Sequence, residues 1–302
     1  MTKKLKLGLA LGSGSARGWS HIGVLKALAT QNIHPDIVCG TSIGALVAAS
    51  YVCNNINKLE ERVRSLSTFD IARFFELNRS LNGFVNQQRL HKFLNTYVAN
   101  DVTLIENSMK QYASVSTELT SGREIWHLEG SVVEAVLASI SMPGLFPAIK
   151  NANRWLVDGG LVNPVPVSVC KALGADVVIA VNLNGDLVGK HFNNIKDKET
   201  SNTGFSNKVA GFLKDYTGSL LPMTKDREQP PGLIDAIAGS VNITQDRITR
   251  SRLAGDPPDI LLAPKLSRVG LLEFYRASET IEEGEKCVAR ALPEIKEALG
   301  IT

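Results

Sequence analysis

Leucines occupy every second position from Leu5 to Leu11, and this period-two pattern predicts a first β-strand. A glycine-rich segment follows the strand. Ile22, Leu25 and Leu28 then recur at helical spacing and predict a helix that ends near Asn32. The next apolar runs predict another strand and another helix. This alternation of strands with helices favours a parallel sheet that is covered by helices on both faces.

Apolar runs and turn residues extend the pattern to the end of the chain. Strands are predicted at residues 36–39, 112–117, 124–128, 155–157, 176–183 and 259–262. Helices are predicted at residues 43–53, 131–139, 164–173, 233–253 and 271–299. The polar stretch 58–100 is expected to form helices over one side of the site. The last helix is expected to be interrupted near Gly284 and Pro293. A solvated face is expected from three arginines of the preceding helix, Arg247, Arg250 and Arg252.

The length of 302 residues and the 44% of hydrophobic residues suit one large α/β domain, with its core at 5–183 and 233–302. Residues 184–232 form a polar insertion that is expected to be a mobile segment or lid. Within it, residues 205–221 have the pattern of an amphipathic helix. Two interpretations stay open for this helix: peripheral contact with a membrane, or packing on its own domain or a second subunit.

Charge and cysteine content exclude several classes of protein. A formal charge of +3 is too small to favour nucleic acid as a partner, and the four cysteines lack metal-ligand spacing. The N-terminal apolar run is shorter than the core of a secretory signal, and no stretch is long enough to span a bilayer. We therefore expect a cytoplasmic protein, with peripheral contact at the inner face of the membrane as an open possibility. The oligomeric state is not assigned.

The segment Gly40-Thr41-Ser42-Ile43-Gly44 lies between a predicted strand and a predicted helix, which is the pattern of a nucleophile elbow. Glycines at Gly40 and Gly44 suit a turn that leaves no room for side chains. Ser42 would then present its hydroxyl at the start of a helix, where the dipole favours negative charge. The alternative is an ordinary turn with a serine helix cap.

The loop Gly12-Ser13-Gly14-Ser15-Ala16-Arg17-Gly18 follows the first strand and precedes a helix. It is similar to a dinucleotide-binding loop, but Arg17 stands where that motif requires glycine. Because a serine elbow follows on the next strand, an oxyanion hole is the better interpretation.

The base that would activate the serine is less evident. A Ser-His-Asp triad in α/β-hydrolase order needs a histidine after the acid, and only His191, in the polar insertion, follows Asp158 or Asp176. Asp158 of the sequence Asp158-Gly159-Gly160 ends a short predicted strand, where sheet enzymes place catalytic groups. The same residues also fit a plain turn.

Together, these three motifs resemble the patatin-like phospholipases in type and in order along the chain. The blocks Ser139–Pro147 and Asn163–Pro166 extend the resemblance, which covers residues 5 to about 183. Residues 249–258 resemble the bacterial branch related to neuropathy target esterase. Ser13 and Ser15 interrupt the run of glycines that is frequent in the family's loop, so the inward-pointing N–H groups stay unassigned.

The resemblance implies an α/β protein of three layers, α/β/α, with a mostly parallel central sheet, which hydrolyses lipid esters without metal or cofactor. It implies Ser42 as the nucleophile and Asp158 as the base. It also implies the Gly12–Gly18 backbone, around Gly14 and Ser15, as the oxyanion hole, with Arg17 holding or charging that loop. Phospholipids or lysophospholipids are the implied substrates. An acyltransferase and a binding module without turnover remain alternatives.

Overall fold

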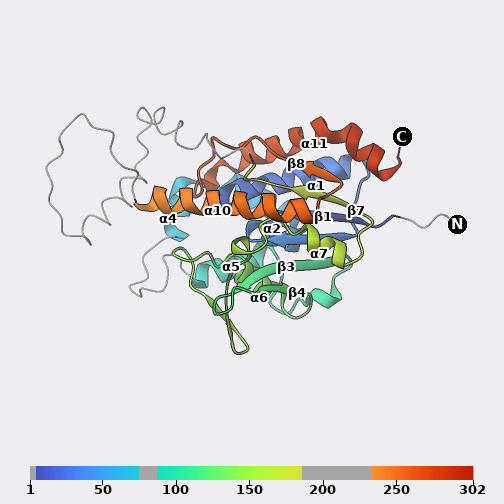
Figure 1. Ribbon diagram of the computed structural model, residues 1–302. Helices are drawn as coiled ribbons and strands as arrows, with labels where there is room; N and C mark the ends of the chain where they lie inside the picture. Colours follow the sequence, from blue (N-terminus) through green and yellow to red (C-terminus); the bar gives the residue numbers. More distant parts are fainter. Residues whose placement is uncertain (1–4, 75–86, 186–232, 302) are drawn as a thin grey trace, which may run out of the picture.

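The computed structural model describes residues 5–74, 87–185 and 233–301, and Figure 1 shows a central sheet between helices. Within these ranges, eight strands form one sheet in the order β5-β6-β3-β2-β1-β7-β8, and β4 pairs with β3. Their bounds are β1 Leu7–Leu11, β2 Ile37–Thr41, β3 Gln111–Glu118, β4 Glu124–His127, β5 Ile149–Asn151, β6 Arg154–Asp158, β7 Val177–Val181 and β8 Ile260–Leu262. All pairings from β3 through β2, β1 and β7 to β8 are parallel, whereas β4, β5 and β6 pair antiparallel. The predicted mostly parallel sheet is confirmed.

Helices cover both faces of the sheet. Their bounds are α1 Ser20–Thr30, α2 Ile43–Val52, α3 Ile56–Arg64, α4 Thr68–Phe74, α5 Gln87–Tyr97, α6 Val132–Ser139, α7 Val167–Ala172, α10 Leu233–Gly255 and α11 Ala277–Leu299. Short 3-10 helices lie at η1 Ser15–Trp19, η2 Ile105–Asn107, η3 Gly159–Leu161 and η5 Phe274–Arg276. In Figure 1, α7 and α10 lie in front of the sheet, and α11 runs along the top of the molecule.

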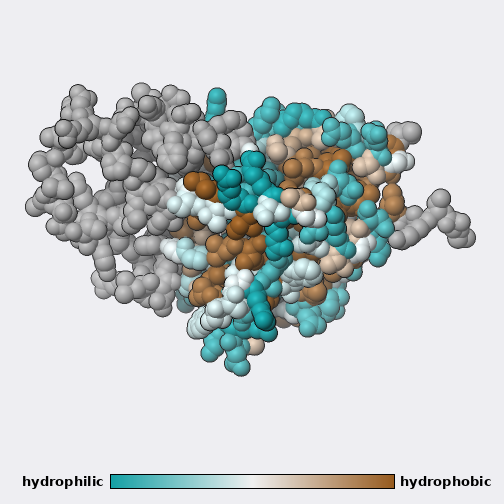
Figure 2. Space-filling model, in the orientation of Figure 1, coloured by the Kyte–Doolittle hydropathy of each residue, from teal (hydrophilic) through white to brown (hydrophobic). Residues whose placement is uncertain are grey.

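The alternation of side chains along each strand divides the core into two layers. Leu9 faces the larger hydrophobic cluster, which contains residues of α1, α2, α6 and α11. The next residue, Ala10, faces a smaller cluster that contains Cys39 and the apolar residues of α7. Hydrophilic residues line the outer surface of α11 along the top of the molecule in Figure 2.

The final helix differs from the prediction. We expected an interruption near Gly284 and Pro293, and this was wrong, because α11 runs continuously from Ala277 to Leu299 with the proline inside it. Gly284 is a packing residue: a Cβ there would lie 2.0 Å from the carbonyl oxygen of Ser20 in α1. The glycine therefore allows α1 and α11 to approach closely, and burial against α1 compensates for poor helix formers.

Two local elements also depart from the prediction. Strand β5 was missed, because its three residues, partly or fully exposed, give no apolar alternation. Helix α7 begins at Val167 and not at Pro164, because the carbonyl of Pro164 instead accepts a hydrogen bond from the Ser13 N–H. The residues before α7 thus line the glycine-rich loop.

Candidate active site

Ser42 lies between β2 and α2 with backbone angles φ 57° and ψ −125°, a conformation that is costly for a residue with a side chain. The two flanking glycines permit it. A Cβ on Gly44 would lie 2.1 Å from the carbonyl oxygen of Leu11, and one on Gly40 would lie 2.4 Å from the nitrogen of Ala45. The predicted residues therefore form a tight strand-to-helix elbow.

Ser139, the last residue of α6, stabilises the elbow through a hydrogen bond to the backbone of Ser42. Its hydroxyl accepts a hydrogen bond from the Ser42 N–H at 2.9 Å and donates one to the carbonyl of Val115 in β3 at 2.6 Å. The Ser42 N–H is therefore occupied. Sequence reasoning placed Ser139 in a family-like block but gave it no role, since a serine in a small-residue helix has no distinctive pattern.

Asp158 ends β6 and meets Ser42 directly. The Ser42 hydroxyl donates to Asp158 Oδ2 at 2.5 Å, and the Gly160 N–H donates to Asp158 Oδ1 at 2.7 Å. Burial raises the pKa of Asp158 to about 6, although both hydrogen bonds oppose this shift. A Cβ on Gly159 would lie 2.2 Å from the carbonyl oxygen of Val115, so the turn packs closely on β3. The structure brings the predicted serine and aspartate together.

The glycine-rich loop leaves two neighbouring N–H groups available. The N–H groups of Gly12, Ser13 and Ala16 donate to the carbonyls of Val181, Pro164 and Leu271 respectively. Those of Gly14 and Ser15 have no acceptor within the described part of the chain. Ser15 has φ 52° and lines the same cavity as Ser42 and Asp158. The loop therefore offers adjacent donors to an anion near Ser42.

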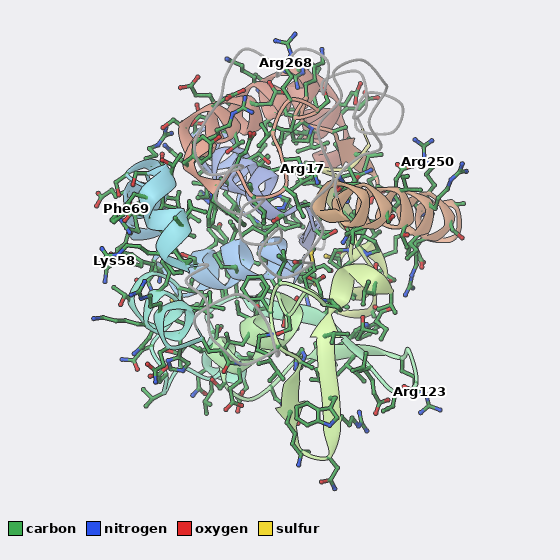
Figure 3. The ribbon with its side chains drawn as sticks, turned by 90° about the vertical axis from the view of Figure 1, so that its left-hand side faces the viewer. Arg17, Lys58, Phe69, Arg123, Arg250 and Arg268 are labelled. Atoms are coloured by element: carbon green, nitrogen blue, oxygen red, sulfur yellow. The ribbon has the colours of Figure 1, made fainter. Side chains whose placement is uncertain are left out.

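Arg17 lies behind this loop with its side chain almost completely buried, at 1% exposure. Its Nε donates to the carbonyl of Gly14 at 3.1 Å, and its Nη2 donates to Asn242 Oδ1 at 2.9 Å. Burial lowers the pKa of Arg17 to about 10, so the guanidinium stays charged at neutral pH. Figure 3 shows Arg17 near the centre of the view, whereas Lys58, Arg123, Arg250 and Arg268 lie at the periphery.

Ala16 and Gly18, the remaining residues of the predicted loop, contribute to the packing of the loop against its neighbours. Both are buried in η1, and a Cβ on Gly18 would lie 2.3 Å from the side chain of Ile43. The loop is thereby pressed against the start of α2, beside the elbow.

His21 contributes a contact that sequence reasoning did not find. Its Nε2 lies 2.8 Å from the carbonyl of Gly12, and it is completely buried. Because a carbonyl only accepts, Nε2 carries the proton in this contact. Burial lowers the pKa of His21 to about 4, so the ring is neutral at physiological pH. This contact fixes the base of the glycine-rich loop.

A cavity of about 110 Å³ reaches Ser42 and Asp158. Its lining is apolar and comes from the elbow, from the segment after α6 and from helices α4 and α5, as expected for the polar stretch 58–100. The apolar residues are Trp19, Ile43, Leu46, Leu66, Ile71, Phe74, Leu90, Phe93, Ile140, Met142, Leu145, Phe146 and Phe274. Such a lining suits a hydrocarbon chain rather than a polar substrate.

Helix α10, in the C-terminal half of the chain, packs against the turn that follows Asp158. Arg252 was expected in a solvated face, and this is only partly right: its side chain is 34% exposed, but its Nε donates to the carbonyl of Val162 at 3.0 Å, and its guanidinium pairs with Glu124. Arg250, by contrast, has a 62% exposed side chain. The contacts of Arg252 were not predicted because its partners lie far away in the sequence and leave no local pattern.

Metal ligands and membrane-spanning helices can be assessed only for the residues that the structure describes. No group of three or more potential metal ligands occurs among the described residues. No helix in that portion is long and apolar enough to cross a bilayer. The predicted amphipathic helix at 205–221 and nearly all of the insertion at 184–232 lie outside the described residues, so the lid and the membrane contact stay predictions.

An α/β sheet carrying a serine elbow, a facing aspartate and a glycine-rich loop defines a class of serine-dependent acyl-transfer folds. The sequence profile described as patatin-like phospholipase matches residues 9–171, which is more than half of the chain. The chain belongs to the patatin-like phospholipase family.

The chain is also similar to several known proteins. An uncharacterized NTE family protein of Mycobacterium tuberculosis (strain ATCC 25618 / H37Rv) is 28% identical over 95% of this chain and 91% of its own length. Lysophospholipase NTE1 of Coccidioides immitis (strain RS) is 28% identical over 98% of this chain, but the match spans only 18% of that protein. Among solved structures, VipD from Legionella pneumophila matches 97% of this chain and 77% of its own with 14% identity and a TM-score of 0.39.

Proposed function

We propose that this protein is a serine acyl hydrolase that cleaves carboxylic esters of phospholipids or lysophospholipids with a Ser42–Asp158 dyad. The observation that carries the proposal is the 2.5 Å hydrogen bond from the Ser42 hydroxyl to Asp158 Oδ2, two residues that line a mostly apolar cavity. Family membership supports a lipid ester as the substrate.

In the acylation step, Ser42 Oγ attacks the ester carbonyl carbon and its proton passes to Asp158 Oδ2. The negative charge that develops on the carbonyl oxygen is stabilised by the N–H groups of Gly14 and Ser15, which have no acceptor among the described residues. When the tetrahedral intermediate collapses, the C–O bond to the leaving alcohol breaks. Asp158 then returns the proton to that alcohol, and an acyl-Ser42 ester remains.

In the second step, water replaces the alcohol. Asp158 accepts a proton from water while the hydroxyl attacks the acyl carbon, and Ser42 leaves with the proton from Asp158. The fatty acid is released and the dyad is restored. A carboxylate with a pKa near 6 suits this work, because it is mostly ionised at neutral pH and still basic enough to take a proton.

A dyad is favoured over a triad by the positions of the histidines. His21 bonds to the Gly12 carbonyl and His127 to the Ser116 hydroxyl, and neither lines the cavity in the part of the chain that the structure describes. Asp158 contacts the serine without an intervening imidazole. This arrangement supports hydrolysis over the acyltransferase alternative, which typically pairs serine with histidine.

The dyad is tested by labelling with a fluorophosphonate and measuring the intact mass of the protein. The wild type should gain one adduct on Ser42, and Ser42→Ala should gain none. Asp158→Asn should label at least 100-fold more slowly, because its amide cannot accept the proton. A wild type that folds normally but stays unlabelled would overturn the proposal.

The labelling rate should also depend on pH. Since the carboxylate form of Asp158 is the active one, the rate should rise with pH through about 6 and level off above about 7. A rate that is independent of pH between 5 and 8 would contradict Asp158 as the base.

A further inference from the structure

Helix α10 contacts the glycine-rich loop although 225 residues separate Arg17 from Asn242. Asn242 and Gln245 lie three residues apart on one face of the helix and are only 5% and 4% exposed. Both lie beyond the segment 9–171 that defines the family match. Buried amides at this spacing, aimed at the loop, need a reason beyond packing.

Asn242 gives Arg17 a neutral partner. Its Oδ1 accepts from Arg17 Nη2 at 2.9 Å. Within the described residues, no carboxylate lies within 4.0 Å of the guanidinium. A carboxylate would bind an arginine more strongly but would cancel its charge. The amide holds Arg17 in place in a buried site and, among the residues that the structure describes, leaves its positive charge without a carboxylate partner.

The position of Arg17 directs this charge at the oxyanion donors. Its Nε donates to the carbonyl of Gly14, and the N–H of the same peptide unit belongs to Ser15. The C=O and N–H of a trans peptide point in opposite directions. A cation on the carbonyl side therefore polarises the Ser15 N–H and fixes its direction away from Arg17, where Ser15 lines the cavity.

Gln245 joins the two catalytic loops. Its Oε1 accepts from the Ser13 hydroxyl and from Asn184 Nδ2, both at 3.0 Å. On the other side, a Cβ at Gly160 would lie 2.4 Å from Gln245 Nε2, so this amide also packs on the turn that follows Asp158. One side chain thus sets the separation between the oxyanion loop and the base.

We propose that Asn242 and Gln245 are positioning residues for catalysis: Asn242 holds Arg17 behind the oxyanion donors without neutralising it, and Gln245 holds the loop in register with the Asp158 turn. This inference rests on the proposed hydrolase function. It makes α10 a part of the catalytic apparatus and not merely a covering helix.

Asn242→Asp separates the electrostatic role from a structural one. The variant keeps an acceptor for Arg17 and adds a negative charge, so its melting temperature should equal or exceed that of the wild type. The rate constant for fluorophosphonate labelling should nevertheless fall about tenfold or more, because the compensated charge no longer polarises the Ser15 N–H. For a short soluble ester, kcat should fall by a similar factor while KM changes less than threefold.

Gln245→Met tests the second contact, and Arg247→Met, at an exposed position of the same helix, is the matched control. The first should slow labelling about tenfold, and the control should label within twofold of the wild type. Ser13→Ala removes the hydrogen bond between Ser13 and Gln245 by deleting only the donor hydroxyl. If Gln245→Met does not fold, the labelling rate of Ser13→Ala tests the role of this contact instead.

Failure of this inference can be told apart from failure of the proposed function. An unlabelled wild type overturns both. A wild type that is labelled at Ser42, together with Asn242→Asp and Ser13→Ala variants that fold and label within twofold of it, overturns only the positioning roles.

Discussion

Ser42 combines a strained backbone with a short hydrogen bond, and the two features have one cause. The φ of 57° and ψ of −125° point the hydroxyl out of the elbow toward Asp158, where it donates at 2.5 Å. A relaxed backbone would turn the side chain elsewhere. The surrounding contacts impose this conformation through the Ser139 hydroxyl and the close approach of Gly44 to β1.

The strain at Ser42 predicts an unusual ranking of two inactive variants. Ser42→Ala keeps a Cβ in the strained conformation, whereas Ser42→Gly removes it. We expect Ser42→Gly to be more stable than Ser42→Ala by about 1 kcal/mol, the reverse of the usual order for these residues. Urea unfolding of both variants would measure this difference. An alanine variant as stable as the glycine variant would mean that the elbow stores no strain.

The residues of the elbow and of the aspartate turn could be predicted because tight turns leave local patterns of glycine. Ser42 with Gly40 and Gly44, and Asp158 with Gly159 and Gly160, are contiguous in the sequence. The supporting residues could not be found in this way. His21 and Gln245 act through contacts that exist only after folding, and their own neighbourhoods are those of ordinary helix residues.

At the scale of elements, the central strands were predicted because burial on both faces produces continuous or alternating apolar runs, as in Val177–Val181. The antiparallel end of the sheet was only partly predicted, since the short, exposed β5 has no such run. The continuity of α11 was missed for a different reason. The sequence alone does not distinguish a glycine that breaks a helix from one, such as Gly284, that allows a second helix to pack closely.

The crossing of α1 and α11 provides a test of that packing. Gly284→Ala would raise helix propensity, which alone would stabilise the protein by about 1 kcal/mol. The new Cβ, however, would lie 2.0 Å from the Ser20 carbonyl oxygen, and this contact forces the helices apart. We therefore expect a loss of about 3 kcal/mol in the free energy of unfolding, from overpacking.

Gly255→Ala at the exposed end of α10 is the control for this substitution. A Cβ there meets nothing within 4 Å, so stability should change by less than about 0.5 kcal/mol. Equal stability of the wild type and the Gly284→Ala variant would show that the two helices can separate at little cost.

At the scale of the whole molecule, the site is assembled around buried titratable groups whose effects on stability differ in sign. Burial raises the pKa of Asp158 and lowers that of His21 to about 4. The stability associated with Asp158 therefore increases as the pH falls through about 6. That associated with His21 decreases as the pH falls below 6.5, because the unfolded state binds a proton there and the folded state does not.

His21→Gln isolates the second effect while the amide can still donate to the Gly12 carbonyl. Between pH 7.5 and pH 5, His21 should cost the wild type about 2 kcal/mol of unfolding free energy, from a pKa near 6.5 when unfolded and about 4 when folded. The variant lacks this loss, so its stability should fall less over the same interval, as measured by urea unfolding at both pH values. His34→Gln, at an exposed position, should retain the wild-type dependence. If the His21 variant also retained it, the imidazole would have to be protonated or solvated in the folded protein, and it could not serve as the neutral donor that holds the glycine-rich loop.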